Sequence, residues 1–187
     1  MTALLIFLGI VAILFLWATS KYNTLIKLRN NRENAFADID VQLKQRHDLI
    51  PQLVATVKGY AAHEKETLEM VVNARNGAIN AKTIDEKIVA ENALTSALAG
   101  LKVTVEAYPD LKANTNFLQL QEEISDIENK LAAVRRYFNS ATKELNTAIE
   151  MFPGNIIAGM FGFRKEMMFD LGEPERKNLE KAPEISF

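Results

Sequence analysis

The sequence predicts an all-α protein, in which one N-terminal transmembrane helix continues into an antiparallel bundle of three to four long helices. Three observations support this fold: an uncharged apolar run at the N-terminus, heptad spacing of apolar residues over two long stretches, and no strand-type alternation in the sequence. The chain has 187 residues and a formal net charge of −2. We expect an anchor at 1–20, a bundle at 21–163 and a charged tail at 164–187.

The N-terminal run is long enough to cross a membrane. Residues 1–20 carry no ionisable side chain, and the first charge is Lys21. At ~1.5 Å per residue, twenty helical residues span about 30 Å, the thickness of a hydrocarbon core. Trp17 and Tyr22 lie where aromatic rings prefer the membrane interface. A cleaved signal peptide is the alternative, but no cationic side chain precedes the apolar run, so we expect an uncleaved single-pass anchor.

The residues that follow the run indicate an orientation. Four cations precede the first acid, Glu33. They are Lys21, Lys27, Arg29 and Arg32. The positive-inside rule then places the bundle in the cytoplasm. The same cations could instead face anionic headgroups without deciding the topology, so a bundle on the periplasmic side stays open.

The first long helix is expected to start within the anchor and to continue well beyond it. Counting by alternate steps of three and four from Tyr22 to Ala74, eleven of sixteen positions are apolar. The register passes through Pro51, so we expect one helix, kinked there, to about Asn76. The alternative is a reversal of the chain at Pro51, with Asp48 as the cap of a new helix.

Two further helices follow. The sequence Thr83-Ile84-Asp85-Glu86 is a capping box that begins a helix ending at Tyr108-Pro109. From Phe117 the heptad count meets eleven apolar positions in succession, and Asn114 or Asn116 is the candidate cap. These positions are Phe117, Leu120, Ile124, Ile127, Leu131, Val134, Phe138, Ala141, Leu145, Ala148 and Phe152. The helix should end at Pro153-Gly154.

The number of reversals decides where the apolar, Gly-rich segment 152–163 lies. With a continuous first helix, the second long helix descends and the heptad helix ascends again, so this segment is expected far from the bilayer. A reversal at Pro51 would place it beside the lipid headgroups. We expect it to cover the core of the bundle, and a membrane-interface or partner-docking role is the alternative.

The candidate interaction residues come from this segment and from the seam of the first helix. Arginines in the seam are expected to pair with carboxylates of the acidic heptad helix, and an anionic ligand or lipid headgroup is the alternative. The candidates are Arg32, Arg46, Phe152, Pro153, Gly154, Asn155, Met160, Phe161 and Phe163.

The sequence offers no motif for chemistry. It has no cysteine, and its two histidines, His47 and His63, would project about 160° apart on one helix, at ~100° per residue. No nucleophile has a companion base, and no phosphate-binding loop is present. No stretch is basic enough for nucleic acid. We therefore predict no enzyme activity, no catalytic residue, no cofactor, no metal and no nucleic-acid partner.

Several motifs resemble the LemA family of bacterial membrane proteins. They are Arg32-Glu33-Asn34-Ala35-Phe36-Ala37-Asp38-Ile39-Asp40-Val41-Gln42-Leu43-Lys44, Arg46-His47-Asp48-Leu49-Ile50-Pro51, Ala107-Tyr108-Pro109-Asp110-Leu111-Lys112-Ala113-Asn114 and Phe152-Pro153-Gly154-Asn155. The resemblance implies an N-terminal transmembrane helix at the bacterial inner membrane, a bundle of about four helices and no established enzymatic activity. Some members of the family are lipoproteins, but this sequence lacks the cysteine that lipid attachment requires.

Together these features predict a scaffold or adaptor that is anchored in the lipid bilayer. We expect it to act by protein–protein interaction or self-assembly, with other membrane proteins or further copies of the chain as partners. The alternative function is a membrane-remodelling or membrane-organising oligomer that holds the segment 152–163 at the bilayer surface.

Overall fold

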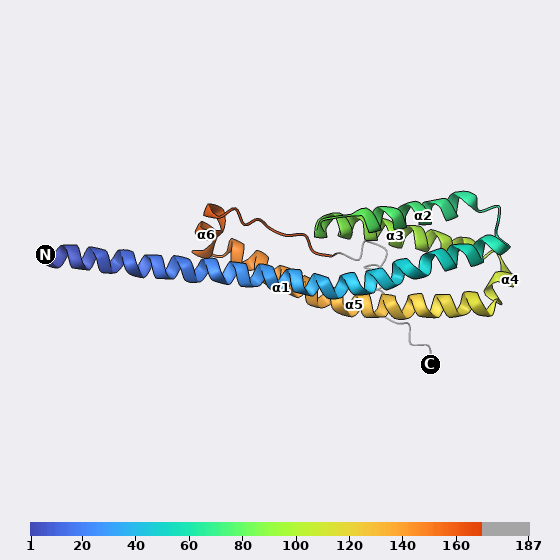
Figure 1. Cartoon of the computed structure of the whole chain (residues 1–187), viewed down its shortest axis with the longest axis horizontal. Helices are drawn as coiled ribbons and strands as arrows, with labels where there is room; N and C mark the ends of the chain where they lie inside the picture. Colours follow the sequence, from blue (N-terminus) through green and yellow to red (C-terminus); the bar gives the residue numbers. More distant parts are fainter. Residues whose placement is uncertain (170–187) are drawn as a thin grey trace, which may run out of the picture. The chain divides into compact units, whose positions relative to one another are not determined.

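The computed structural model describes residues 1–169, and these residues form helices and connections without a strand (Figure 1). The predicted all-α class is confirmed. The helices are α1 (Thr2–Tyr60), α2 (Lys65–Asn80), α3 (Ile84–Val105), α4 (Pro109–Lys112), α5 (Thr115–Glu150) and α6 (Gly154–Met160). The tail predicted at 164–187 is described only as far as Phe169, and the rest of it lies outside the described residues.

The described residues form two compact units. Unit 1 holds Met1–Asp38 and Val134–Met168, and unit 2 holds Ile39–Ala133 together with Phe169. The helices α1 and α5 each contribute one part to each unit.

Helix α1 runs through Pro51 without interruption, as predicted, and the alternative of a reversal there is wrong. Proline has no N–H, so the carbonyl of His47, four residues earlier, loses its partner within the helix. Arg75 on α2 replaces that partner, because its Nε donates a hydrogen bond to the His47 carbonyl over 2.7 Å. A long-range hydrogen bond therefore satisfies the group that Pro51 leaves open.

The prediction that the first helix reaches Asn76 is wrong, because α1 ends at Tyr60 and α2 begins at Lys65. The reversal is held by side chains from much later in the chain. The Tyr108 hydroxyl donates to Glu64 Oε1 over 2.9 Å, and Asn114 Nδ2 donates to the Tyr60 hydroxyl over 2.9 Å. The bond to Glu64 also raises the pKa of Tyr108. No local turn motif marks the end of α1, and the apolar spacing continues beyond it. The sequence therefore predicted a helix that was too long.

The predicted capping box at the start of α3 is present. Thr83 Oγ1 accepts from the Glu86 N–H over 3.2 Å, and Glu86 Oε2 accepts from the N–H groups of Lys82 and Thr83. Those two N–H groups lower the pKa of Glu86, because they stabilise its charged form. Asn114 is the cap of α5, since its Oδ1 accepts from the Phe117 N–H over 3.0 Å.

The heptad seam of α5 is confirmed at ten of its eleven positions, which are buried or half-buried. Phe138, in the part of α5 that belongs to unit 1, is fully buried and packs edge-on against Phe36 with ring centroids 5.4 Å apart. The eleventh position is a correction: α5 ends at Glu150, and Phe152 lies beyond it with 79% of its surface exposed.

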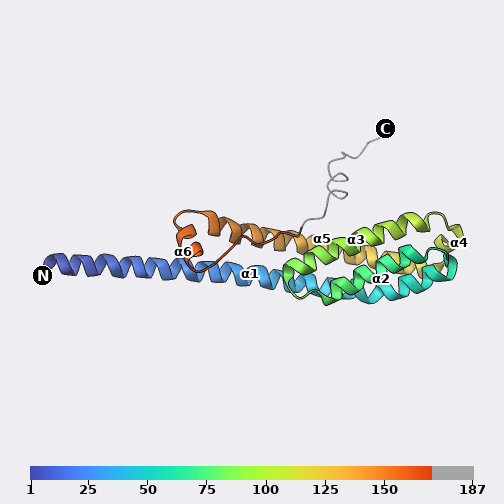
Figure 2. The ribbon, with the colours of Figure 1, turned by 90° about the horizontal axis from the view of Figure 1, so that it is seen from above.

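In unit 2, α2 and α3 lie along the part of α1 that follows Ile39 (Figures 1 and 2). The pairs Asp40–Lys87 and Arg46–Glu91 advance together along α1 and α3, so these two helices run in the same direction. Apolar side chains from α1 to α5 meet in one core of unit 2, which includes Ile50, Leu53, Val57, Leu68, Val71, Leu94, Leu101, Val105, Leu111 and Phe117.

The contact between Arg75 and the His47 carbonyl can be tested by a double-mutant cycle. Arg75→Leu should lower the free energy of unfolding by about 1–2 kcal/mol, because a carbonyl is left without a donor. In a Pro51→Ala background the new N–H can bond that carbonyl, so the same change should cost less. Guanidinium unfolding of the detergent-solubilised full chain, followed by circular dichroism, measures both losses.

The control is Lys65→Leu on the same helix, an exposed change that should cost under ~0.5 kcal/mol in either background. Equal costs of Arg75→Leu with and without Pro51 would show that Arg75 does not serve the open carbonyl.

Candidate functional site

Helix α6 in unit 1 packs against the end of the apolar run of α1. Ile157 and Ala158 are buried against Leu25. Half-buried apolar side chains complete this contact: Trp17, Ala18, Tyr22, Ala148, Ile149 and Phe163. The segment 152–163 therefore lies beside residues 17–25, and the expectation that it lies far from the apolar run is wrong. The physical reason is the reversal after Tyr60, which returns α5 toward the N-terminal part of α1.

The other side of this segment is apolar and exposed. Phe152 is 79% exposed and Met160 is 73% exposed, and Ile156 and Phe161 each expose more than half of their surface. The ring of Phe161 lies 4.7 Å from that of Tyr22, centroid to centroid. Unit 1 thus presents large apolar side chains directly beside the aromatic end of the apolar run.

Gly154, the first residue of α6, has a steric role at the turn between α5 and α6. A Cβ atom on Gly154 would lie 2.9 Å from the backbone oxygen of Ala148, which is closer than such atoms approach in proteins. Gly154 therefore allows α6 to fold back tightly onto α5. Of the remaining predicted residues in this segment, Asn155 is exposed, whereas Pro153 and Phe163 are half-buried.

Arg32 is buried in unit 1 and serves the packing of the segment after α6. Its guanidinium forms an ion pair with Glu166 at 3.1 Å, donates to the Met167 carbonyl over 3.1 Å and lies 5.0 Å from the ring centre of Phe138. Glu166 is held in turn by Asn146, through its own N–H and carbonyl. The expected carboxylate partner exists, but it follows α6 and does not belong to the acidic heptad helix.

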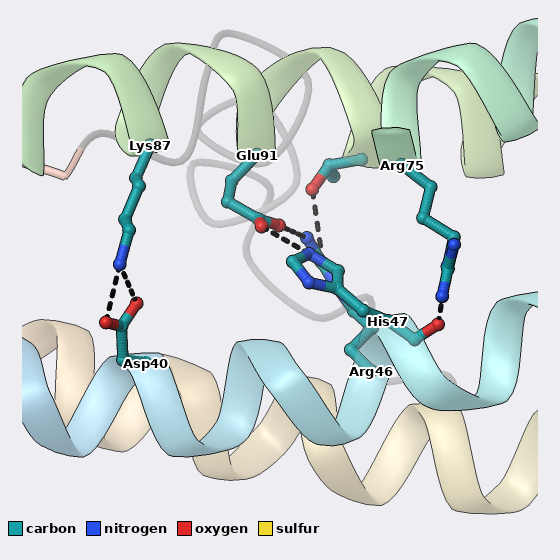
Figure 3. Close-up of polar contacts among 7 residues, drawn as sticks. Asp40, Arg46, His47, Arg75, Lys87 and Glu91 are labelled. Atoms are coloured by element: carbon teal, nitrogen blue, oxygen red, sulfur yellow. Dashed lines mark hydrogen bonds and ion pairs between the residues drawn. The ribbon is translucent and has the colours of Figure 1, made fainter. Parts of the chain in front are cut away.

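Arg46 is buried in unit 2 within a polar cluster (Figure 3). Its guanidinium forms an ion pair with Glu91 on α3 and donates to Thr95 Oγ1 over 3.3 Å. His47 Nε2 lies 2.6 Å from the other oxygen of Glu91. The predicted partner helix is again wrong, because the carboxylate comes from α3.

Glu91 is only 1% exposed, so its charge depends on these partners. A second pair flanks the cluster, in which Lys87 Nζ contacts both oxygens of Asp40 at 2.6 and 2.8 Å (Figure 3). These contacts join α1 to α3 at defined positions along both helices.

Of the residues labelled in Figure 3, only Arg46 was among the sequence candidates, so Glu91 and Arg75 were both missed. Glu91 lies between Ile88 and Leu94 on the apolar face of α3, and an acid in that position is a sequence signal for a buried ion pair. Arg75 carries no such signal, because it serves a backbone carbonyl.

Among residues 1–169 no group of three or more His, Cys, Asp or Glu side chains could hold a metal ion. His47 is engaged with Glu91, and His63 is exposed in the connection after α1. Two helices in this part of the chain are long and apolar enough to cross a membrane. The apolar window of α1 is not buried at all, whereas that of α3 is partly buried and contains Glu91.

Comparison with known proteins gives consistent matches. Residues 35–187 match the LemA family. Protein LemA of Metamycoplasma hominis is 27% identical over 181 residues, which cover 96% of this chain and 82% of that protein. Magnetosome protein MamQ of Magnetospirillum gryphiswaldense is 21% identical over 175 residues, covering 80% of this chain and 64% of that protein. Magnetosome protein MamQ 2 of Paramagnetospirillum magneticum is 20% identical over the same length.

Removing the charge of Glu91 should strongly destabilise the chain. Glu91→Gln leaves Arg46 buried without its carboxylate, and the loss of one partner of a buried ion pair costs about 3–5 kcal/mol. Thermal unfolding of the detergent-solubilised protein measures this loss. The matched control is Glu122→Gln on the exposed face of α5, which should cost under ~0.5 kcal/mol.

Replacing Arg46, His47 and Glu91 together tests whether the loss of stability comes from an unpaired buried charge. A chain with Arg46→Leu, His47→Leu and Glu91→Leu should be more stable than the Glu91→Gln variant, because it buries no unpaired charge. Similar unfolding temperatures for Glu91→Gln and Glu122→Gln would mean that the cluster does not hold α1 to α3.

Proposed function

Since this chain belongs to the LemA family, whose members are membrane-associated helical proteins, we propose that it is a membrane-anchored scaffold or adaptor. It binds other membrane proteins or further copies of itself at the bacterial inner membrane. It performs no chemistry of its own, and none of the matched relatives carries a name that states an enzymatic activity.

One observation carries this proposal: a single helix, α1, contains both the exposed apolar run and core positions of unit 2. The run ends near Ser20, whereas Ile39, Leu43 and Ile50 on the same helix are almost completely buried. No linker separates the anchor from the folded part, so whatever binds unit 2 is held at the membrane by one continuous helix.

The character of the buried polar groups supports the same function. In unit 2 the buried Arg46 and Glu91 form an ion pair and His47 contacts the same carboxylate, so these polar groups are bound to one another, as a structural role requires. The exposed face of α3 is uncharged at heptad spacing and includes Val89, Ala93, Ser96, Gly100 and Val103. Such a surface suits a partner helix that packs alongside α3.

Site-specific photo-crosslinking of the full chain in native membranes tests the scaffold. A photoreactive residue at Val89 or Val103 should give a discrete adduct, either a dimer or one reproducible heavier species. The control position is Glu122, on the exposed face of α5, which should give much less. A monomeric protein without adducts at the exposed positions of α2, α3 and α5 would contradict the proposal.

We place the bundle in the cytoplasm, since four cations and no acid lie between the apolar run and Glu33. The chain has no cysteine, so Ser140→Cys introduces a single exposed thiol on α5. A membrane-impermeant maleimide should leave this thiol unlabelled in intact spheroplasts and label it after lysis. Labelling of intact spheroplasts would place the bundle on the outer side.

A second candidate function, organisation of the membrane by an oligomer, is favoured by one observation. Helix α6 packs against residues 17–25, at the end of the apolar run. Homo-oligomers that bend liposomes would support this function over the scaffold, whereas defined hetero-complexes on flat membranes would support the scaffold.

A further inference from the structure

We infer that the surface around α6 is a second membrane contact, which inserts its apolar side chains into the interface of a bilayer containing anionic phospholipids. We define the α6 patch as Phe152, Ile156, Met160 and Phe161. The inference rests on the membrane anchoring of α1 in the proposed function, and it adds a lipid ligand and the residues that bind it.

The depth of α6 follows from its packing. If residues 1–20 cross the hydrocarbon core, the run ends at its boundary, and Trp17 and Tyr22 lie at headgroup level. The core around α6 contains residues between Trp17 and Leu25, a rise of ~12 Å along α1. Interfacial helices bury their apolar face about 5–10 Å into the headgroup and acyl boundary. Helix α6 is therefore held at the depth where such a face binds.

The patch has the composition of an interfacial surface. All four of its side chains are more than half exposed, whereas Ile157 and Ala158 on the same short helix are buried against α1. Exposed apolar side chains gathered at one place mark a contact with a partner or a membrane. The patch is continuous with the anchor through the rings of Tyr22 and Phe161, 4.7 Å apart, which favours lipid over a protein partner.

The surrounding charge selects the kind of lipid. Residues 1–32 and 151–165, which build this surface, contain no acidic side chain. Lys21 and Arg164 are exposed, and they directly adjoin two residues of the contact with α6, Tyr22 and Phe163. Two further cations are partly neutralised, because Arg29 pairs with Glu33 and Lys165 pairs with Glu150. A cationic surface at headgroup level attracts anionic phospholipids.

Tryptophan fluorescence with lipid quenchers tests the insertion directly. The chain has one tryptophan, so Trp17→Phe gives a silent background for Phe161→Trp. The full-length variant is reconstituted into vesicles of phosphatidylcholine and phosphatidylglycerol that carry bromine on acyl carbons near the headgroup. We expect the emission to be clearly lower in these vesicles than in vesicles of the same lipids without bromine. The control is Val103→Trp in the same background, an exposed position of unit 2, whose emission should not change.

Each outcome bears on the inference. Quenching at position 161 supports it, whereas a blue-shifted but unquenched emission means that protein covers the patch and overturns it. If the tryptophan emits as it does in water, but the chain resists alkaline carbonate extraction, the inference is overturned while the anchor stays in place. A chain that carbonate extracts from the vesicles overturns the anchor, and with it the proposed function.

The lipid charge has its own test. In vesicles of phosphatidylcholine alone the quenching should decrease, and Lys21→Gln with Arg164→Gln should reduce it to a similar extent in the anionic vesicles. The control pair is Lys130→Gln with Lys143→Gln on α5, which should leave it unchanged. Equal quenching in vesicles with and without phosphatidylglycerol would overturn the role assigned to anionic headgroups. The same holds if the two pairs of substitutions lower the quenching equally.

Discussion

The reversal of the chain between Tyr60 and Glu64 is the constraint on which the later helices depend. Each reversal inverts the direction of the chain, so the reversals before α2, α3 and α5 leave α5 antiparallel to α1. Contacts within unit 1 show this direction, since Phe138 meets Phe36 whereas Ile149, later on α5, joins the core around Leu25. Without the turn after Tyr60, α5 would lead away from the apolar run, and α6 could not pack beside Trp17. Two hydrogen bonds, from Tyr108 to Glu64 and from Asn114 to Tyr60, help to hold this turn.

In unit 2 apolar contacts and polar contacts have different roles. The apolar core supplies most of the stability, but leucine and valine pack in several registers with similar energy. A buried carboxylate has far fewer acceptable positions, because an unpaired charge is costly. Glu91 can be buried only where both Arg46 and His47 reach it, which fixes α3 along α1. Arg75 adds a similar condition for α2, since the carbonyl that Pro51 leaves open lies at one position on α1.

Features encoded by local sequence could be predicted, and features set by distant residues could not. The capping box at Thr83, the cap at Asn114 and the seam of α5 depend on neighbours within one or two turns, and all three are present. The end of α1 was missed because Thr67 and Val71 continue its register, although they belong to α2. The buried arginines were expected to have acidic partners, but the identity of Glu91 and Glu166 depends on how the helices pack. The α6 segment was recognised as unusual from its composition, whereas its position required the number of reversals.

If α1 is the membrane anchor proposed above, the position of α6 also bears on how α1 is held in the bilayer. A single transmembrane helix is free to tilt in any direction, and its tilt is set by its flanking contacts. Helix α6 covers one side of α1, through Ile157 and Ala158 on Leu25. If its exposed side chains lie in the interface, a tilt toward α6 drives them into the hydrocarbon, and a tilt away exposes them to water. Both motions are opposed, because one places the cations Lys21 and Arg164 in lipid and the other exposes apolar rings. The same short helix that completes the packing of unit 1 would then define the angle at which the anchor enters the membrane.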